Sequence, residues 1–340
     1  MADLSTTYLG LRLRSPLMPG ASPMVDNLDT VRRLADAGAA AIVMHSLFEE
    51  QFVREQLATV HHLEAHADSF AEALSYLPRP SDFALGPEQY LAQIARIKAA
   101  VGLPVIASLN GTSAGGWLGY ARRIEEAGAD ALELNVYHIS TDPRETAGAV
   151  ERRLLTLLRA VKAEVKIPVA VKLSPFFSAM AHFASEIDAA GADGLVLFNR
   201  FYEPDIDPES LNVAPRLALS TGTELPLRLH WLAILSGRLR ASLAVTGGVH
   251  TALDAIRAVM AGADAVQLVS ALLLRGPQYL GVVRREMEAW MDAHEYVSLR
   301  QMRGSLNLER CPDPAAFERA NYVRVLQAWN ATPSLRLVGR

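Results

Sequence analysis

The chain has 340 residues, half of them apolar, a net charge of −4 and a single cysteine, Cys311. This charge balance gives no electrostatic reason to expect a nucleic-acid partner, and no apolar run reaches the ~18 residues of a membrane span. One cysteine rules out an internal disulfide and argues against a cysteine-ligated metal or cluster within the chain. We therefore expect a cytoplasmic protein with a small-molecule substrate and no metal site.

One pattern recurs four times along the chain: a helix end, then Ala-Gly-Ala, then an apolar strand. Glycine suits the point where each helix stops because it tolerates the left-handed backbone conformation. Further apolar strands are predicted at 16–22, 104–111, 168–176 and 243–249. The four copies read DAGAAAIVMHS from Asp36, EAGADALELNV from Glu126, AAGADGLVLFN from Ala189 and MAGADAVQLVS from Met260.

Counted in chain order, these are eight apolar strands, each followed by a segment with helical spacing of apolar residues. The alternation predicts an α/β protein, a (β/α)8 TIM barrel. An open doubly wound sheet is the rival, but no GxGxxG follows the first strand. We expect the barrel to span 1–293, with a long insertion at 48–86 after the second strand and a C-terminal helical extension at 294–340.

Polar residues gather where the predicted strands end, which in such a barrel is the face that carries the active site. Burying such groups unpaired would cost about 1–3 kcal/mol each, so they must meet one another, water or a ligand. The residues at these strand ends are, in chain order, Ala21, Ser22, His45, Ser46, Asn110, Asn135, Tyr137, His138, Lys172, Asn199, Arg200, Thr246, Gly247, Gly248, Gln267 and Ser270.

Two of these strand ends indicate a chemistry. The TGGV turn with Gly247 and Gly248, together with Ser270, stands where barrels commonly bind phosphate through backbone N–H groups. Lys172 lies inside the apolar strand VAVKLSP, so its ammonium would face the barrel mouth. It could form a Schiff base, as in an aldolase or lyase, or it could stabilise an anionic cofactor ring.

The segments SPLMPGAS, ELNVYH, PVAVKLSPFF, LFNRF, AVTGGV and AVQLVSALL together resemble the soluble class of dihydroorotate dehydrogenases. The likeness covers most of residues 1–290, in order and on the corresponding strands. It implies an FMN-containing barrel that oxidises dihydroorotate to orotate in pyrimidine biosynthesis. An alternative is a non-catalytic subunit that binds flavin or phosphate.

The resemblance also implies roles for individual residues. Lys172 would lie near the N1–C2 edge of the flavin and hold the negative charge of the reduced ring. Asn135 and Asn199 match asparagines that hydrogen-bond substrate or flavin. The other residues implied in FMN binding are Ala21, Ser22, Ser46, Asn110, Ser220, Thr221, Thr246, Gly247, Gly248, Ser270 and Ala271.

The sequence departs from the family on the substrate side. The family motif Asn-x-Ser-Cys-Pro-Asn, with serine in place of cysteine in some members, reads Asn135-Val136-Tyr137-His138-Ile139-Ser140. His138 thus takes the position of the proton acceptor, and imidazole suits that role near neutral pH. We expect His45, Ser140 and Arg200 to contact a substrate that is dihydroorotate or a related acid, because Arg200 can bind a carboxylate. A homodimer is also predicted, and the electron acceptor stays open.

Overall fold

The computed structural model describes residues 2–51, 85–111, 118–214 and 217–328. Most of the predicted insertion, 52–84, and the end of the predicted C-terminal extension, 329–340, lie outside the described residues. The division at 293 stays a prediction.

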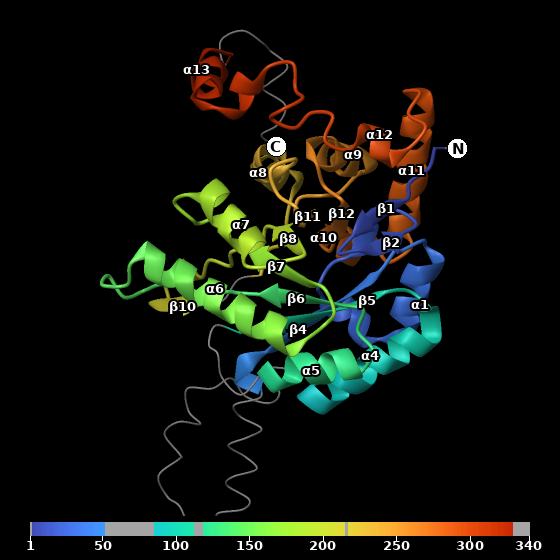
Figure 1. Cartoon of the computed structure of the whole chain (residues 1–340), viewed down its shortest axis with the longest axis vertical. Coiled ribbons are helices and arrows are strands. Elements are labelled where there is room, and N and C mark those ends of the chain that lie inside the picture. Colours follow the sequence, from blue (N-terminus) through green and yellow to red (C-terminus); the bar gives the residue numbers. More distant parts are fainter. Residues whose placement is uncertain (1, 52–84, 112–117, 215–216, 329–340) are drawn as a thin grey trace, which may run out of the picture.

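An eight-stranded parallel sheet forms the centre of the molecule (Figure 1). The strand order is that of a barrel: β3-β12-β11-β8-β7-β6-β5-β4. The two ends of this sheet are joined by a hydrogen bond in which the Ala40 N–H donates to the Leu17 carbonyl at 3.0 Å. The predicted (β/α)8 barrel is therefore confirmed and the open sheet is wrong. The strands are β3 (Leu17–Pro19), β4 (Ile42–Phe48), β5 (Val105–Asn110), β6 (Ala131–Asn135), β7 (Val169–Leu173), β8 (Gly194–Leu197), β11 (Ser242–Thr246) and β12 (Ala265–Leu268).

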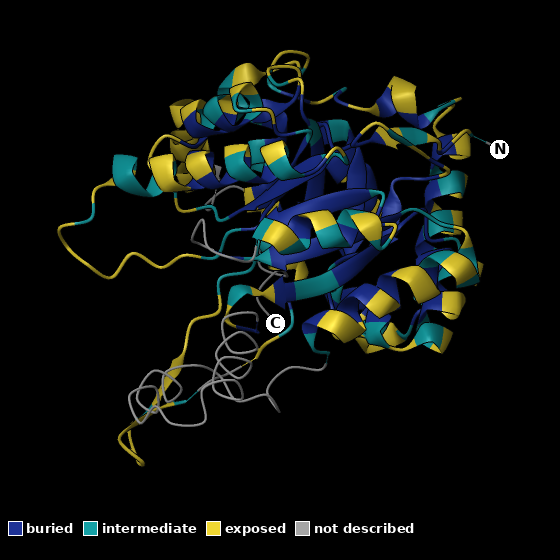
Figure 2. Ribbon diagram, turned by 60° about the horizontal axis from the view of Figure 1, so that its bottom comes forward, coloured by how far each residue is buried: buried dark blue, intermediate teal, exposed yellow. Residues whose placement is uncertain are grey.

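Helices cover the outside of the sheet, with buried residues facing it and exposed residues facing out (Figure 2). In α6 (Ala147–Glu164), for example, the buried positions Leu154, Leu158 and Val161 recur every three or four residues and form one apolar stripe. The other helices of this layer are α1 (Leu28–Asp36), α4 (Pro87–Val101), α5 (Leu118–Glu126), α7 (Met180–Ala189), α8 (Leu225–Leu235), α9 (Ala252–Ala261), α10 (Ser270–Arg275) and α11 (Tyr279–Ala293).

The Ala-Gly-Ala repeat has a structural explanation. Its four glycines all adopt positive φ, between 96° and 125°, where side chains are disfavoured: Gly38, Gly128, Gly191 and Gly262. In three copies an aspartate follows and accepts the N–H of the first or second residue of the preceding strand. Asp130 accepts from Val105 at 2.7 Å, Asp193 from Val169 at 2.7 Å and Asp264 from Leu243 at 2.9 Å. In these three copies the segment that follows the helix is therefore fastened to the sheet.

A hairpin that the sequence analysis did not anticipate lies across the N-terminal end of the barrel. It consists of β1 (Thr6–Tyr8) and β2 (Leu11–Leu13), and its Tyr8 and Leu9 pack among small inward-facing residues such as Ala131 and Ala244. Gly194 leaves the room for this plug, because a Cβ there would lie 2.5 Å from Leu9. With this end filled, the opposite end is free to hold a site.

Two further segments extend beyond the barrel. Within the predicted long loop 201–225 the structure has an antiparallel hairpin, β9 (Asp205–Asp207) with β10 (Asn212–Ala214), and the short helix η3 (Gly222–Glu224). The C-terminal part carries α12 (Leu299–Met302), η4 (Pro314–Phe317) and α13 (Arg319–Ala328). Near the N-terminus, the short helix η1 (Pro23–Asp26) follows β3. Among the described residues, none of the helices combines the length and apolar character of a membrane span.

Candidate active site at the barrel mouth

A cavity of about 660 Å³ opens at the C-terminal ends of β3 to β8. It brings together nine of the residues predicted from strand ends, which come from six different strands. The predicted residues in its wall are Ala21, Ser22, His45, Ser46, Asn110, Asn135, Tyr137, Lys172 and Asn199. The predicted convergence of strand ends on one pocket therefore exists in the structure.

Lys172 lies at the inner end of this cavity and is 6% exposed. Its Nζ donates to Glu133 Oε1 at 3.2 Å, and Glu133 is fully buried on the neighbouring strand β6. Gln267 Nε2 donates to the other carboxylate oxygen at 2.7 Å. The barrel thus holds a buried ammonium–carboxylate pair directly below its mouth. This is the arrangement of a fixed cation and not of a free amine nucleophile.

Two asparagines form a chain of amide contacts across the cavity. Asn199 Nδ2 donates to Asn135 Oδ1 at 2.8 Å, and Asn135 Nδ2 reaches Ser46 Oγ at 3.4 Å. Ser46 in turn shares a hydrogen bond of 2.8 Å with Ser108. Asn110 stands directly beside Asn135 in the register of β5 with β6. These side chains present a row of polar edges, which a planar heterocycle could contact.

His45 enters the cavity because the pairing of β4 with β5 is irregular between Val43 and Ser46. Irregularities of this kind redirect a side chain. Its Nδ1 lies 2.6 Å from Asp26 Oδ1, an ion-pair contact whose angles are not those of a hydrogen bond. The ring also meets Tyr90 edge to face at 5.1 Å. His45 is thus a fixed polar group in the same cavity as Lys172, and its role as a substrate contact stays a prediction.

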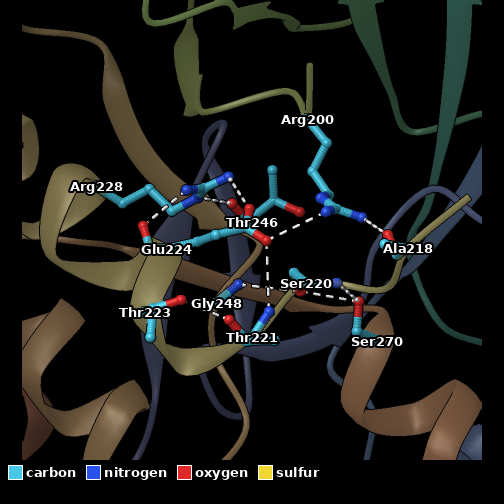
Figure 3. Close-up of polar contacts among 10 residues, drawn as sticks. All are labelled: Arg200, Ala218, Ser220, Thr221, Thr223, Glu224, Arg228, Thr246, Gly248 and Ser270. Carbon is cyan, nitrogen blue, oxygen red and sulfur yellow. Dashed lines mark hydrogen bonds and ion pairs between the residues drawn. The ribbon is translucent and has the colours of Figure 1, made fainter. Parts of the chain in front are cut away.

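The predicted phosphate-binding residues meet at the ends of β11 and β12 (Figure 3). Ser220 donates through both its N–H, at 3.0 Å, and its hydroxyl, at 2.8 Å, to Ser270 Oγ, and the Gly248 N–H donates to Ser220 Oγ at 3.3 Å. Gly247 and Gly248 both have positive φ, and a Cβ on Gly248 would lie 2.6 Å from the backbone nitrogen of Leu225. The turn therefore requires glycine for close packing as well as for conformation.

The remaining predicted phosphate-side residues lie around this turn. The Thr246 carbonyl accepts a bond from Arg228 Nε at 2.5 Å, and the Thr221 N–H donates to Glu224 Oε1 at 3.4 Å. Ala271 is buried in the first turn of α10. Arg200, predicted as a substrate contact, reaches instead toward Glu224 and the Ala218 carbonyl.

His138 lies in the wall of a second cavity, of about 470 Å³, and does not line the cavity of Lys172. Its Nε2 is 3.1 Å from Glu145 Oε2 and 2.9 Å from Arg153 Nη1. Hydrogen bonds from Ser140, and then from His138, lower the pKa of Glu145 to about 2. Ser140 belongs to this second cavity too. Tyr137 and Ile139 line both cavities, so the loop after β6 forms the wall between them.

The sequence analysis missed several residues of the mouth. Glu133 stood within the repeat copy EAGADALELNV without a predicted role, although a charged residue between two leucines was a usable signal. Arg228 was likewise visible as one cation in the apolar run LPLRLHWLAIL. Asp26 gave no local signal, because its role depends on His45 from the next strand. No group of three or more metal-binding side chains occurs within the described ranges.

A family model described as dihydroorotate dehydrogenase matches residues 83–291, which span β5 to β12. The chain is 29% identical to proteins named dihydroorotate dehydrogenase B (NAD(+)), catalytic subunit, from Thermoplasma acidophilum and Thermoplasma volcanium, over 309 residues that cover 89% of this chain and 99% and 98% of those relatives. It is 26% identical to a putative dihydroorotate dehydrogenase A (fumarate) from Aeropyrum pernix, over 89% of this chain and 97% of that relative.

Proposed function

The chain belongs to the dihydroorotate dehydrogenase family of oxidoreductases, and from that premise we propose that it uses FMN to oxidise a CH–CH bond of dihydroorotate or a related acidic substrate. The observation that carries the proposal is the cavity in which Lys172, Asn135 and Asn199 converge at the end of the matched barrel strands. The mouth of such a barrel is where catalytic residues of different strands meet.

The residues present fit a flavin. Ser22 Oγ lines this cavity, is buried and lacks a hydrogen-bond partner among the described residues, so a polar ligand would satisfy it. Ala21, Ser22 and the amides of Asn110, Asn135 and Asn199 would hold the ring, and Gly247, Gly248, Ser220, Thr221 and Ser270 would hold the phosphate. When bound, FMN supplies the acceptor for the hydride that leaves the substrate carbon.

Lys172 would act as a fixed cation beside the ring. Its burial removes the water that would otherwise screen its charge, which strengthens its effect on negative charge that develops nearby. The Glu133 contact holds Nζ in place and favours this role over that of a Schiff-base nucleophile. The same contact argues against the aldolase alternative.

We assign the proton-accepting role to His138, which takes the position of the proton acceptor in the family motif after β6. In the structure its imidazole contacts Glu145 and Arg153, so the assignment requires the loop after β6 to turn the ring toward the neighbouring cavity. His45 would contact the acidic end of the substrate, since an imidazole N–H can donate a hydrogen bond to a carboxylate.

Electrons must leave the flavin after each turnover. The Thermoplasma relatives are named catalytic subunits of an NAD(+)-type enzyme. The single cysteine cannot ligate an iron–sulfur cluster, because such clusters are commonly held by four cysteines. We therefore propose that a nicotinamide route would run through a second, partner chain, in the cytoplasm.

The test uses the purified protein under anaerobic conditions. We expect a flavin absorption spectrum that bleaches when dihydroorotate is added and does not bleach with dihydrouracil, which lacks the carboxylate. A flavin that stays oxidised with dihydroorotate rejects that substrate. A colourless protein that takes up no added FMN rejects the whole proposal.

A further inference from the structure

Three charged side chains meet beside the Gly247–Gly248 turn, and Figure 3 shows them pointing toward one another. The Glu224 carboxylate lies 3.2 Å from Arg200 Nη2 and 3.4 Å from Arg228 Nη2. The Thr221 N–H also points at this carboxylate, at 3.4 Å. Two guanidinium groups and a backbone N–H are the donors that commonly bind a phosphate group. Here an internal carboxylate takes the place of such an anion.

Arg228 is held in this cluster by contacts that do not need the carboxylate. It is 4% exposed, and it donates to two carbonyl groups, those of Thr246 at 2.5 Å and Glu224 at 2.8 Å. Gly247 makes room for it, because a Cβ at that position would lie 2.7 Å from Arg228 Nη2. The guanidinium therefore keeps its position if the Glu224 side chain moves away.

The cluster carries an unbalanced positive charge, since two guanidinium groups face one carboxylate among the described residues. Burial is costly for such a charge unless an anion compensates it. Burial lowers the pKa of Arg228, and the nearby Arg200 adds to that effect against the opposing pull of Glu224. A phosphate monoester, which carries nearly two negative charges at neutral pH, would balance the two arginines if it replaced the carboxylate.

We propose that Arg200 and Arg228 bind the phosphate of the cofactor, and that Glu224 occupies their anion site until the phosphate displaces it. The inference rests on the proposed flavin function and adds to it two cationic ligands and a resident competitor. It means that the chain selects a flavin with a terminal phosphate over one without.

The geometry allows this exchange. The Arg200 and Glu224 side chains are 21% and 29% exposed, so the carboxylate can turn outward while Arg228 stays inside. The strands β8, β11 and β12 are neighbours in the sheet, which places Arg200, Gly248 and Ser270 along one stretch of the rim. A phosphate there would meet the Gly248 and Thr221 N–H groups and both arginines.

The experiment compares FMN with riboflavin, which has the same ring and no phosphate. Flavin is stripped from the full-length protein, and both ligands are titrated by calorimetry. We expect Glu224→Gln to tighten FMN binding several-fold and to leave riboflavin binding unchanged. We expect Arg200→Gln to weaken FMN binding by roughly tenfold to a hundredfold, the effect of one charge-assisted hydrogen bond, again without an effect on riboflavin.

A matched control is Arg240→Gln, which removes an arginine whose side chain is 82% exposed and pairs with Asp188 away from the mouth. It should change neither affinity. Because Arg228 is buried and its variants could fail to fold, the test relies on Arg200 and Glu224. If Glu224→Gln weakens FMN as Arg200→Gln does, or if neither changes the FMN-to-riboflavin ratio, the inference is overturned while flavin binding stands. If the wild type binds neither ligand, the proposed function itself fails.

Discussion

The buried pair of Lys172 and Glu133 gives a prediction that can be made quantitative. The Lys172 side chain is 7% exposed and that of Glu133 is fully buried, and their charged atoms are 3.2 Å apart. Replacing Lys172 with methionine keeps a similar chain length but leaves the carboxylate without its cation. Removing one partner of a buried ion pair costs about 3–5 kcal/mol.

That free energy converts to a shift in melting temperature. At about 2–3 °C for each kcal/mol in a large chain, we expect Lys172→Met to lower Tm by about 6–15 °C. The assay is differential scanning calorimetry of protein from which flavin has been removed, because a bound ligand would add its own stabilisation.

A double variant separates the lost charge from lost packing. Lys172→Met combined with Glu133→Gln removes both charges, and the new glutamine can still accept a hydrogen bond from Gln267, which now lies 2.7 Å from the carboxylate. We expect the double variant to recover most of the lost stability, since replacing both partners of a buried pair is often close to neutral. The reasoning is refuted if Lys172→Met melts within a degree or two of wild type, or if the double variant is less stable than the single one.

Three further predictions concern the loop after β6 and the Gly247–Gly248 turn. His138→Ala should leave flavin bound and slow its anaerobic reduction by roughly 10²–10⁴-fold in stopped-flow absorbance, as expected for loss of a proton acceptor; unchanged rates would remove that role. Because the pKa of Glu145 is lowered from 4.5 to about 2, its contribution to loop stability is present above pH 4.5 and is lost as the pH falls through about 2. A carboxyl NMR titration of Glu145 with a midpoint near 4.5 would contradict this. Gly248→Ala should destabilise the protein and abolish the preference for FMN over riboflavin in calorimetric titrations, because its Cβ would lie 2.6 Å from the Leu225 nitrogen at a φ of +80°.

Local patterns were sufficient to predict the barrel. Apolar runs of strand length and glycines at helix ends depend on neighbours in the sequence, and all eight predicted strands and the positive φ of repeat glycines such as Gly128 are present. The Tyr8 plug was missed because its partners come from many strands. The hairpin β9–β10 was missed because its strands are three residues long and largely exposed.

The sequence predicted which strand ends line the cavity, but not the contacts that their side chains make. A strand end fixes where a residue such as Lys172 stands, because parallel strands all end at one rim. It does not fix the partner: Glu133 is on another strand, and His138 is turned by Glu145 and Arg153, which come later in the chain. Side-chain direction in a loop depends on such distant groups, so a family motif located His138 without giving its orientation.

The charges at the rim of the barrel differ in a way that matches the proposed cofactor. In the cavity of the barrel mouth, Lys172 is balanced by Glu133, which would suit the proposed oxidised flavin ring without net charge. Beside the Gly247–Gly248 turn, Arg200 and Arg228 exceed Glu224 by one positive charge, which suits a phosphate. A ligand with a neutral ring and an anionic tail would therefore be expected to bind in one direction only. Because Glu133 partly balances the charge of Lys172, this cation would stabilise a negatively charged reduced ring only in part.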